Sequence, residues 1–142
     1  MFSKNEAKRL RQEFWTSFGK SFPQDWILYN TSVKGLSFKF HFDTKTAYVA
    51  LCIDMDPIKQ QAYWNQILSH KTILETDFLP QVRFEEFFEV SHEKILSVAY
   101  VTIDSKVSIH DKSSWRSVME FLNETMRKFE AFYSLHENTV KI

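Results

Sequence analysis

Residues 36–53 read LSFKFHFDTKTAYVALCI. In residues 36–42 a large apolar side chain occupies every second position, which is the period of a strand with one buried face. Residues 43–45 are polar and favour a turn, and apolar residues alternate again over residues 47–54. We therefore predict a β-hairpin.

A helix is predicted directly after this hairpin. Asp56 is a typical N-cap residue, and Pro57 stands at the first helical position, where proline is favoured. Apolar residues then recur at helical spacing from Tyr63 to Phe78, and Pro80 closes the segment.

The same order of elements repeats downstream. Residues 82–90 and 94–104 have strand composition and are separated by a polar turn at 91–93. Cap candidates at 111–114 then precede a long helix that contains Trp115. The chain therefore carries two successive strand-strand-helix units.

A further helix is predicted at the N-terminus. Ser3 and Glu6 have the spacing of a capping box, and Leu10, Phe14 and Phe18 follow at helical spacing. The elements together predict an α+β fold with a mainly antiparallel sheet of about four to five strands and helices mostly on one face. We expect residues 1–142 to form one domain, because this is close to the modal domain size.

Composition excludes several classes of protein. Eighteen basic residues balance eighteen acidic ones, so no net charge attracts the whole chain to nucleic acid or to a membrane. Cys52 is the only cysteine, which excludes an internal disulfide and fits a reducing compartment. Only two glycines are present, so phosphate-binding glycine loops are excluded. We expect a soluble cytoplasmic protein without a cofactor, a bound metal or a membrane partner.

One short motif suggests metal-dependent chemistry. Asp104 and Lys106, at the end of a predicted strand, match the acid-x-lysine element of metal-dependent nucleases. A second carboxylate would have to come from a neighbouring strand, and the candidates are Asp54, Glu86 and Glu89. The alternative is that Asp104 and Lys106 are ordinary turn residues, and that Asp54 is a surface carboxylate beside the Asp56 cap.

The segment around Glu86 contains a conflict. If Phe84 and Phe88 both face the core by strict alternation, Glu86 faces it too. A β-bulge would remove the conflict, whereas a buried Glu86 would require a cationic partner.

Two further sets of residues permit competing interpretations. Tyr48 and Tyr100 lie on the polar sides of their strands, where they form either a stacking surface for single-stranded nucleic acid or routine cross-strand pairs. The five histidines include no closely spaced pair of the kind that binds zinc. His70 lies on an apolar helix stripe, which favours a hydrogen-bonded histidine at the core.

Several segments resemble a bacterial family of domains of unknown function. The segments are LRQEFWTSFG at residues 10–19, residues 26–31, the hairpin 37–54, the proline-started helix and Trp115. The resemblance implies no established activity and no catalytic residues. It does imply that such domains stand alone or follow domains similar to nucleases of defence systems, and this favours an accessory or recognition role. Here no attached nuclease is expected.

The leading hypothesis is a non-catalytic binding or interaction module. It would engage a protein or nucleic-acid partner through an exposed sheet face or through the groove beside the N-terminal helix, and an exposed apolar patch would support it. One alternative is a metal-dependent nuclease-like enzyme that uses Asp104 and Lys106. Another is a homodimeric structural module in which an aromatic face is a subunit interface.

Overall fold

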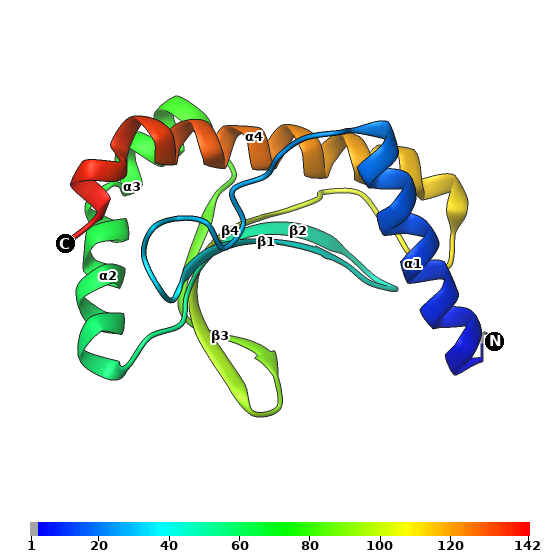
Figure 1. Cartoon of the computed structure of the whole chain (residues 1–142), viewed down its shortest axis with the longest axis horizontal. Coiled ribbons are helices and arrows are strands. Elements are labelled where there is room, and N and C mark those ends of the chain that lie inside the picture. The colour runs from blue at the N-terminus through cyan, green and yellow to red at the C-terminus, as the bar shows by residue number, and fades with distance from the viewer. Residues whose placement is uncertain (1–2) are drawn as a thin grey trace.

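The structure, a computed structural model that describes residues 3–142, follows the predicted order of helices and hairpins (Figure 1). Its main elements are α1 Lys4–Ser21, β1 Leu36–Phe42, β2 Ala47–Ile53, α2 Pro57–Ser69, α3 Lys71–Ile73, β3 Arg83–Ser91, β4 Lys94–Thr102 and α4 Trp115–Val140. A π-helical turn, Leu74–Phe78, follows α3, and a short 3-10 turn, Lys112–Ser114, precedes α4. The α+β class is confirmed.

The strands form one sheet with the order β1-β2-β4-β3, and each neighbouring pair is antiparallel. In the described residues this sheet has four strands, within the predicted range. The register places Ile53 of β2 opposite Ser97 of β4, and Tyr48 of β2 opposite Thr102. The two central strands therefore run in opposite directions.

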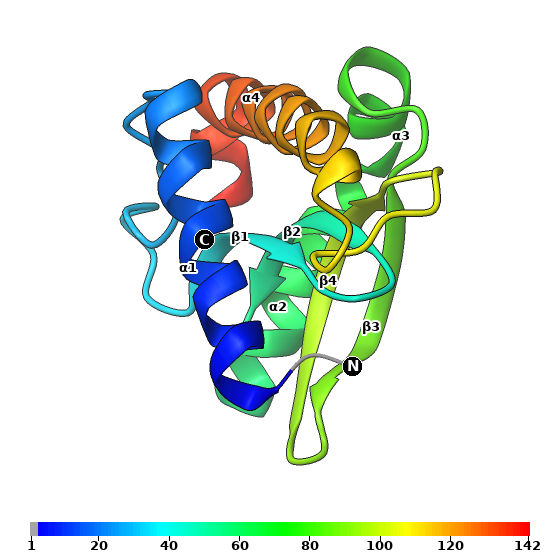
Figure 2. The ribbon, with the colours of Figure 1, turned by 90° about the vertical axis from the view of Figure 1, so that its right-hand side faces the viewer.

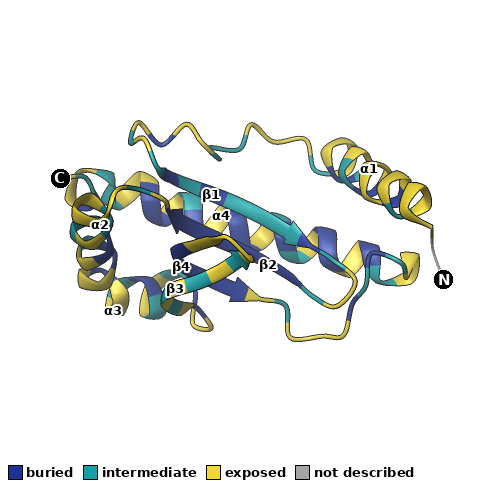
Figure 3. Ribbon diagram, turned by 90° about the horizontal axis from the view of Figure 1, so that it is seen from below, coloured by how far each residue is buried: buried dark blue, intermediate teal, exposed yellow. Residues whose placement is uncertain are grey.

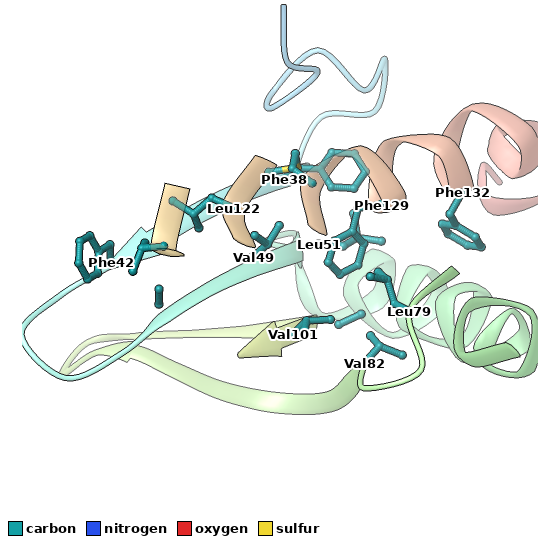
Figure 4. Packing of buried hydrophobic residues seen from close by; sticks show 14 of the residues in the cluster. Phe38, Phe42, Val49, Leu51, Leu79, Val82, Val101, Leu122, Phe129 and Phe132 are labelled. Atoms are coloured by element: carbon teal, nitrogen blue, oxygen red, sulfur yellow. The ribbon is translucent and has the colours of Figure 1, made fainter. Parts of the chain in front are cut away.

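The long helix α4 covers one face of the sheet (Figures 1 and 4). The ring of Phe129 is fully buried and lies 6.1 Å, centroid to centroid, from the ring of Phe38 on β1. Val49 and Leu51 of β2 face the same side and are also buried. The large residues at every second position of the first hairpin are thus the floor of the main core.

Helices α1 and α2 flank the two ends of the sheet (Figures 1 and 2). The start of α1 agrees with the predicted capping box, because the Glu6 backbone N–H donates to Ser3 Oγ at 3.1 Å. Phe14 of α1 packs against Phe42 and Trp115, with ring centroids 4.7 and 5.4 Å away.

Helix α2 is shorter than predicted because the chain breaks at His70. This side chain is buried, and its Nδ1 lies 2.7 Å from the Gln66 carbonyl oxygen, which would otherwise accept the helical N–H four residues later. The Ser69 hydroxyl donates to the same oxygen at 2.6 Å. The prediction of a hydrogen-bonded core histidine is confirmed, whereas that of one continuous helix to Phe78 is wrong.

Strand β3 carries the bulge that the sequence suggested. Phe84 lies opposite Ala99 and Phe88 opposite Leu96, so both Glu86 and Phe87 fall opposite Ser97. Phe84 and Phe88 consequently face opposite sides of the sheet, and Glu86 is only half-buried. The same bulge turns Phe87 out to solvent, where 77% of its surface is exposed.

In the described part of the chain, no helix crosses the second face of the sheet (Figure 3). Its centre is closed by its own side chains, which form a second buried cluster of Tyr48, Ala50, Cys52, Leu96, Val98 and Tyr100. Phe88 packs against this cluster. Among residues 3–142, none of the helices has the length and apolar character needed to cross a bilayer.

Candidate binding site

The structure separates two of the carboxylates that the sequence proposed for a metal site, Asp54 and Asp104. Asp54 follows Ile53, whose partner on β4 is Ser97, whereas Asp104 lies beyond Thr102, whose partner is Tyr48. Because β2 and β4 are antiparallel, Asp54 and Asp104 lie at opposite ends of the sheet. Roughly six residue pairs at about 3.3 Å each lie between them, which is too far for a shared cation.

Most of the candidates have a local partner or an exposed position. The Asp54 carboxylate accepts from Lys94 Nζ at 2.7 Å, and Asp56 caps α2 by accepting from the Lys59 backbone N–H. Asp104 and Lys106 are exposed, and Glu89 is exposed opposite Ile95.

Two of the candidates, Asp54 and Glu86, do line one hollow of about 340 Å³ beside α2. The amide of Gln60 forms hydrogen bonds at the wall of this hollow through both of its ends. Its Nε2 donates to the Ile53 carbonyl and to Ser97 Oγ, and its Oε1 accepts from the Met55 N–H. Across residues 3–142, three or more acidic, histidine or cysteine side chains gather nowhere in a way that would hold a metal ion.

The tyrosines of the second sheet face are not a free stacking surface. Only 9% of the surface of Tyr48 and 7% of that of Tyr100 is exposed. Their rings pack edge to face with centroids 6.2 Å apart. They are cross-strand core residues, which was the alternative interpretation.

Cys52 in the same cluster gives a direct chemical test of this buried face. Burial raises the pKa of its thiol to about 11, so the reactive thiolate is scarce at pH 8. We expect Ellman's reagent to leave Cys52 unmodified in the native protein and to modify it fully in denaturant. Rapid native reaction at the rate of a free thiol would show that the second cluster opens.

A concave feature with a largely apolar lining lies beside the start of β1. We call it the terminal groove, and it has a volume of about 500 Å³. It is formed by the loop before β1, the first turns of α2 and the last residues of the chain, and its lining is Ser32, Val33, Lys34, Met55, Ile58, Lys59, Ala62, Tyr63, Lys141 and Ile142. Three segments far apart in sequence therefore meet here.

The loop wall of the groove is held in an unusual conformation. Leu28 and Ser32 have positive φ angles of 45° and 69°, which residues other than glycine seldom adopt. The buried Thr31 hydroxyl lies within hydrogen-bonding distance of two carbonyl oxygens to which it can donate, that of Val33 at 3.0 Å and that of Leu36 at 2.7 Å. Tyr133 of α4 donates its hydroxyl to the Thr31 carbonyl at 2.7 Å. The wall is thus fixed in advance of any binding.

The C-terminal wall is tied to α2. Gln66 Nε2 donates to the Thr139 carbonyl at 2.9 Å, and His70 Nε2 lies 2.8 Å from Thr139 Oγ1. The Ile142 N–H reaches the Tyr63 hydroxyl at 3.4 Å. These contacts hold Lys141 and Ile142 against the groove.

The groove combines exposed apolar side chains with positive charge. Ile58 and Ile142 remain 85% and 73% exposed on its border. Lys34, Lys59 and Lys141 surround them, and of these only Lys141 is ion-paired in the described residues, with Glu137 at 2.9 Å.

Sequence reasoning missed this groove. The one sequence feature that pointed to the groove was Ile58. At 100° per residue, Ile58 lies on the opposite side of α2 from the buried Ile67. An apolar residue outside the buried stripe points either to chance exposure or to a binding surface.

Comparison with known proteins identifies a family. The model of the family described as "Domain of unknown function (DUF4268)" matches residues 10–137. Neither a curated protein nor a solved structure shows a match.

Proposed function

The chain belongs to the DUF4268 family, whose description assigns it no activity, and we propose that it is a non-catalytic binding module for an acidic, apolar segment of a partner protein. The terminal groove is the proposed site. We propose that the module acts in the cytoplasm, because a lone, buried cysteine fits a reducing compartment. The nuclease-like companion domains implied by the resemblance stay a prediction.

The observation that carries this proposal is the exposure of Ile58 on the border of a concave, fixed surface. Its side chain contributes little to the core, since 85% of its surface is in water. Burying such a side chain under a ligand is worth about 1.5–3 kcal/mol. The loop opposite is already ordered, so a ligand would not lose free energy in ordering it.

The charge of the groove selects the kind of segment. Lys34 and Lys59 form no ion pair within residues 3–142, so an acidic ligand would supply a partner. Such charge complementarity raises the rate and specificity of association more than the affinity. Apolar anchors flanked by Asp or Glu therefore match this surface.

The two alternative functions have less support from the geometry. A nuclease-like centre would need Asp104 beside another strand carboxylate, and the antiparallel register places Asp54 and Asp104 at opposite ends of the sheet. A homodimer through the groove would place three lysines of one copy near those of another if the contact were two-fold symmetric.

Selection from a displayed library of random peptides tests the proposal without a known partner. We expect the wild-type protein to enrich peptides that combine Asp or Glu with large apolar residues. Ile58→Glu should weaken these peptides at least about tenfold, because about 1.4 kcal/mol of lost apolar burial corresponds to tenfold. The readout is fluorescence anisotropy of the enriched peptides.

Leu135→Glu is the matched control, because Leu135 is 72% exposed on α4 and lies outside the groove lining. It should leave peptide affinity unchanged. Enriched peptides without acidic bias, or equal loss in both variants, would refute the proposal. So would a wild-type dimer in light scattering that Ile58→Glu converts to a monomer, since the groove would then be a subunit interface.

A further inference from the structure

One flank of α1 carries only positive charge. At 100° per residue, Lys4, Lys8 and Arg11 fall within about 60° of one another around the helix, together with Trp15. The acidic residues Glu6 and Glu13 lie on the other flank. Glu13 is paired there with Lys112 at 2.9 Å.

This flank is the site of a charge imbalance in a neutral chain. Helix α1 contains five basic and two acidic side chains, a net charge of +3. The whole chain has a net charge of +0, so the residues outside α1 carry −3. Lys8 and Arg11 make no ion pair within residues 3–142, and their charges remain available to a ligand.

A shallow hollow of about 560 Å³ lies along the same flank, lined by Lys8, Arg11, Gln12, Trp15 and Thr16. The Trp15 ring is half-buried and is held by rings of Phe14, Phe18 and Phe40, at centroid distances of 4.9, 6.0 and 6.1 Å. Part of the indole therefore faces the hollow in a fixed orientation.

We propose that this flank of α1 binds single-stranded nucleic acid. Lys4, Lys8 and Arg11 span about 10 Å of helix axis, enough to contact two or three successive phosphates. The indole of Trp15 supplies a surface on which one base stacks, a contact worth about 1–3 kcal/mol that requires no particular sequence. Gln12 and Thr16 add hydrogen-bonding groups beside it.

Other polyanions fit this flank less well. A duplex keeps its bases paired and offers none to stack on Trp15. Three cations alone bind an anionic lipid surface weakly, at about 1 kcal/mol each, and stable binding also uses large apolar side chains that insert beside them. The exposed large apolar residues of the described chain all lie outside α1.

Anisotropy of fluorescein-labelled oligothymidylate tests the proposal over a range of NaCl concentrations. We expect log K to fall with log salt with a slope of about −2, because each neutralised phosphate on a single strand contributes about −0.7. The double variant Lys8→Glu, Arg11→Glu should weaken binding at least about tenfold, a loss of about 1.4 kcal/mol. Circular dichroism checks that the variant keeps its helices.

Lys106→Glu combined with Lys128→Glu is the matched control, because it makes the same change in net charge at exposed sites outside α1. It should retain most of the affinity. An abasic strand of equal length isolates stacking without a change to the protein, and it should bind more weakly than oligothymidylate.

Three results would overturn the proposal. The first is an equal loss of affinity in the two double variants. The second is an affinity for the abasic strand or for a duplex that equals the affinity for oligothymidylate. The third is charge-sensitive binding to phosphatidylserine vesicles without binding to the strand. Ile58→Glu should not change strand binding, so the outcome is independent of the terminal groove.

Discussion

Phe129→Ala is expected to lower the free energy of unfolding by about 3–5 kcal/mol, the usual range for removing a buried phenylalanine ring. Phe129 has no solvent exposure and packs from α4 onto Phe38 at the centre of the core (Figure 4). The cavity left behind would remove the contact between α4 and Phe38 of the sheet. Urea denaturation followed by circular dichroism measures the loss.

Phe87→Ala is the control for this prediction, because it makes the same chemical change at a ring that is 77% exposed. We expect it to change stability by no more than about 0.5 kcal/mol. Similar losses in the two variants would mean that Phe87 is packed in solution or that α4 does not rest on Phe38.

The contrast between these two phenylalanines shows where sequence reasoning succeeds. Strict alternation over β1 identified Phe38 as a core residue, because the period of a strand assigns each side chain to a face. In the second hairpin, residues 84–88 break that period. The conflict at Glu86 correctly pointed to a bulge, yet the pattern could not say that Phe87 would turn outward, since this depends on which residues face Ser97.

The relative position of the candidate carboxylates could not be predicted for a different physical reason. Asp54 and Asp104 each end the second strand of a hairpin, so they look equivalent along the chain. Whether they meet depends on strand order, which local patterns do not encode. Because β2 and β4 are direct antiparallel neighbours, equivalent strand ends point in opposite directions.

The terminal groove was harder still to predict, because it arises from long-range contacts. Its loop wall depends on Tyr133, which is 102 residues away from Thr31 in sequence. Ser32 and Leu28 adopt positive φ although neither is a residue type that favours it. Such conformations persist only where the surrounding structure enforces them.

Gly35→Ala is expected to lower the free energy of unfolding by about 3 kcal/mol, a loss that combines backbone strain with steric overlap. Gly35 has a φ of +88°, in the region that L-residues avoid. An added Cβ would lie 2.6 Å from the Asp54 carbonyl oxygen and 2.8 Å from Met55 Cγ. The backbone cannot retreat easily, because the Asp54 N–H donates to the Gly35 carbonyl at 2.8 Å.

The same variant connects stability to the groove. Met55 lines the groove, so the displacement that the added methyl group forces on it should also weaken the selected peptides. Gly19→Ala is the matched control, because nothing lies within 4 Å of its added Cβ and Gly19 sits inside α1. It should stabilise the protein by about 0.5–1 kcal/mol, the difference in helix propensity. If Gly35→Ala were as well tolerated as Gly19→Ala, the loop before β1 would be free to move, and the groove would lack the fixed wall on which the proposed binding depends.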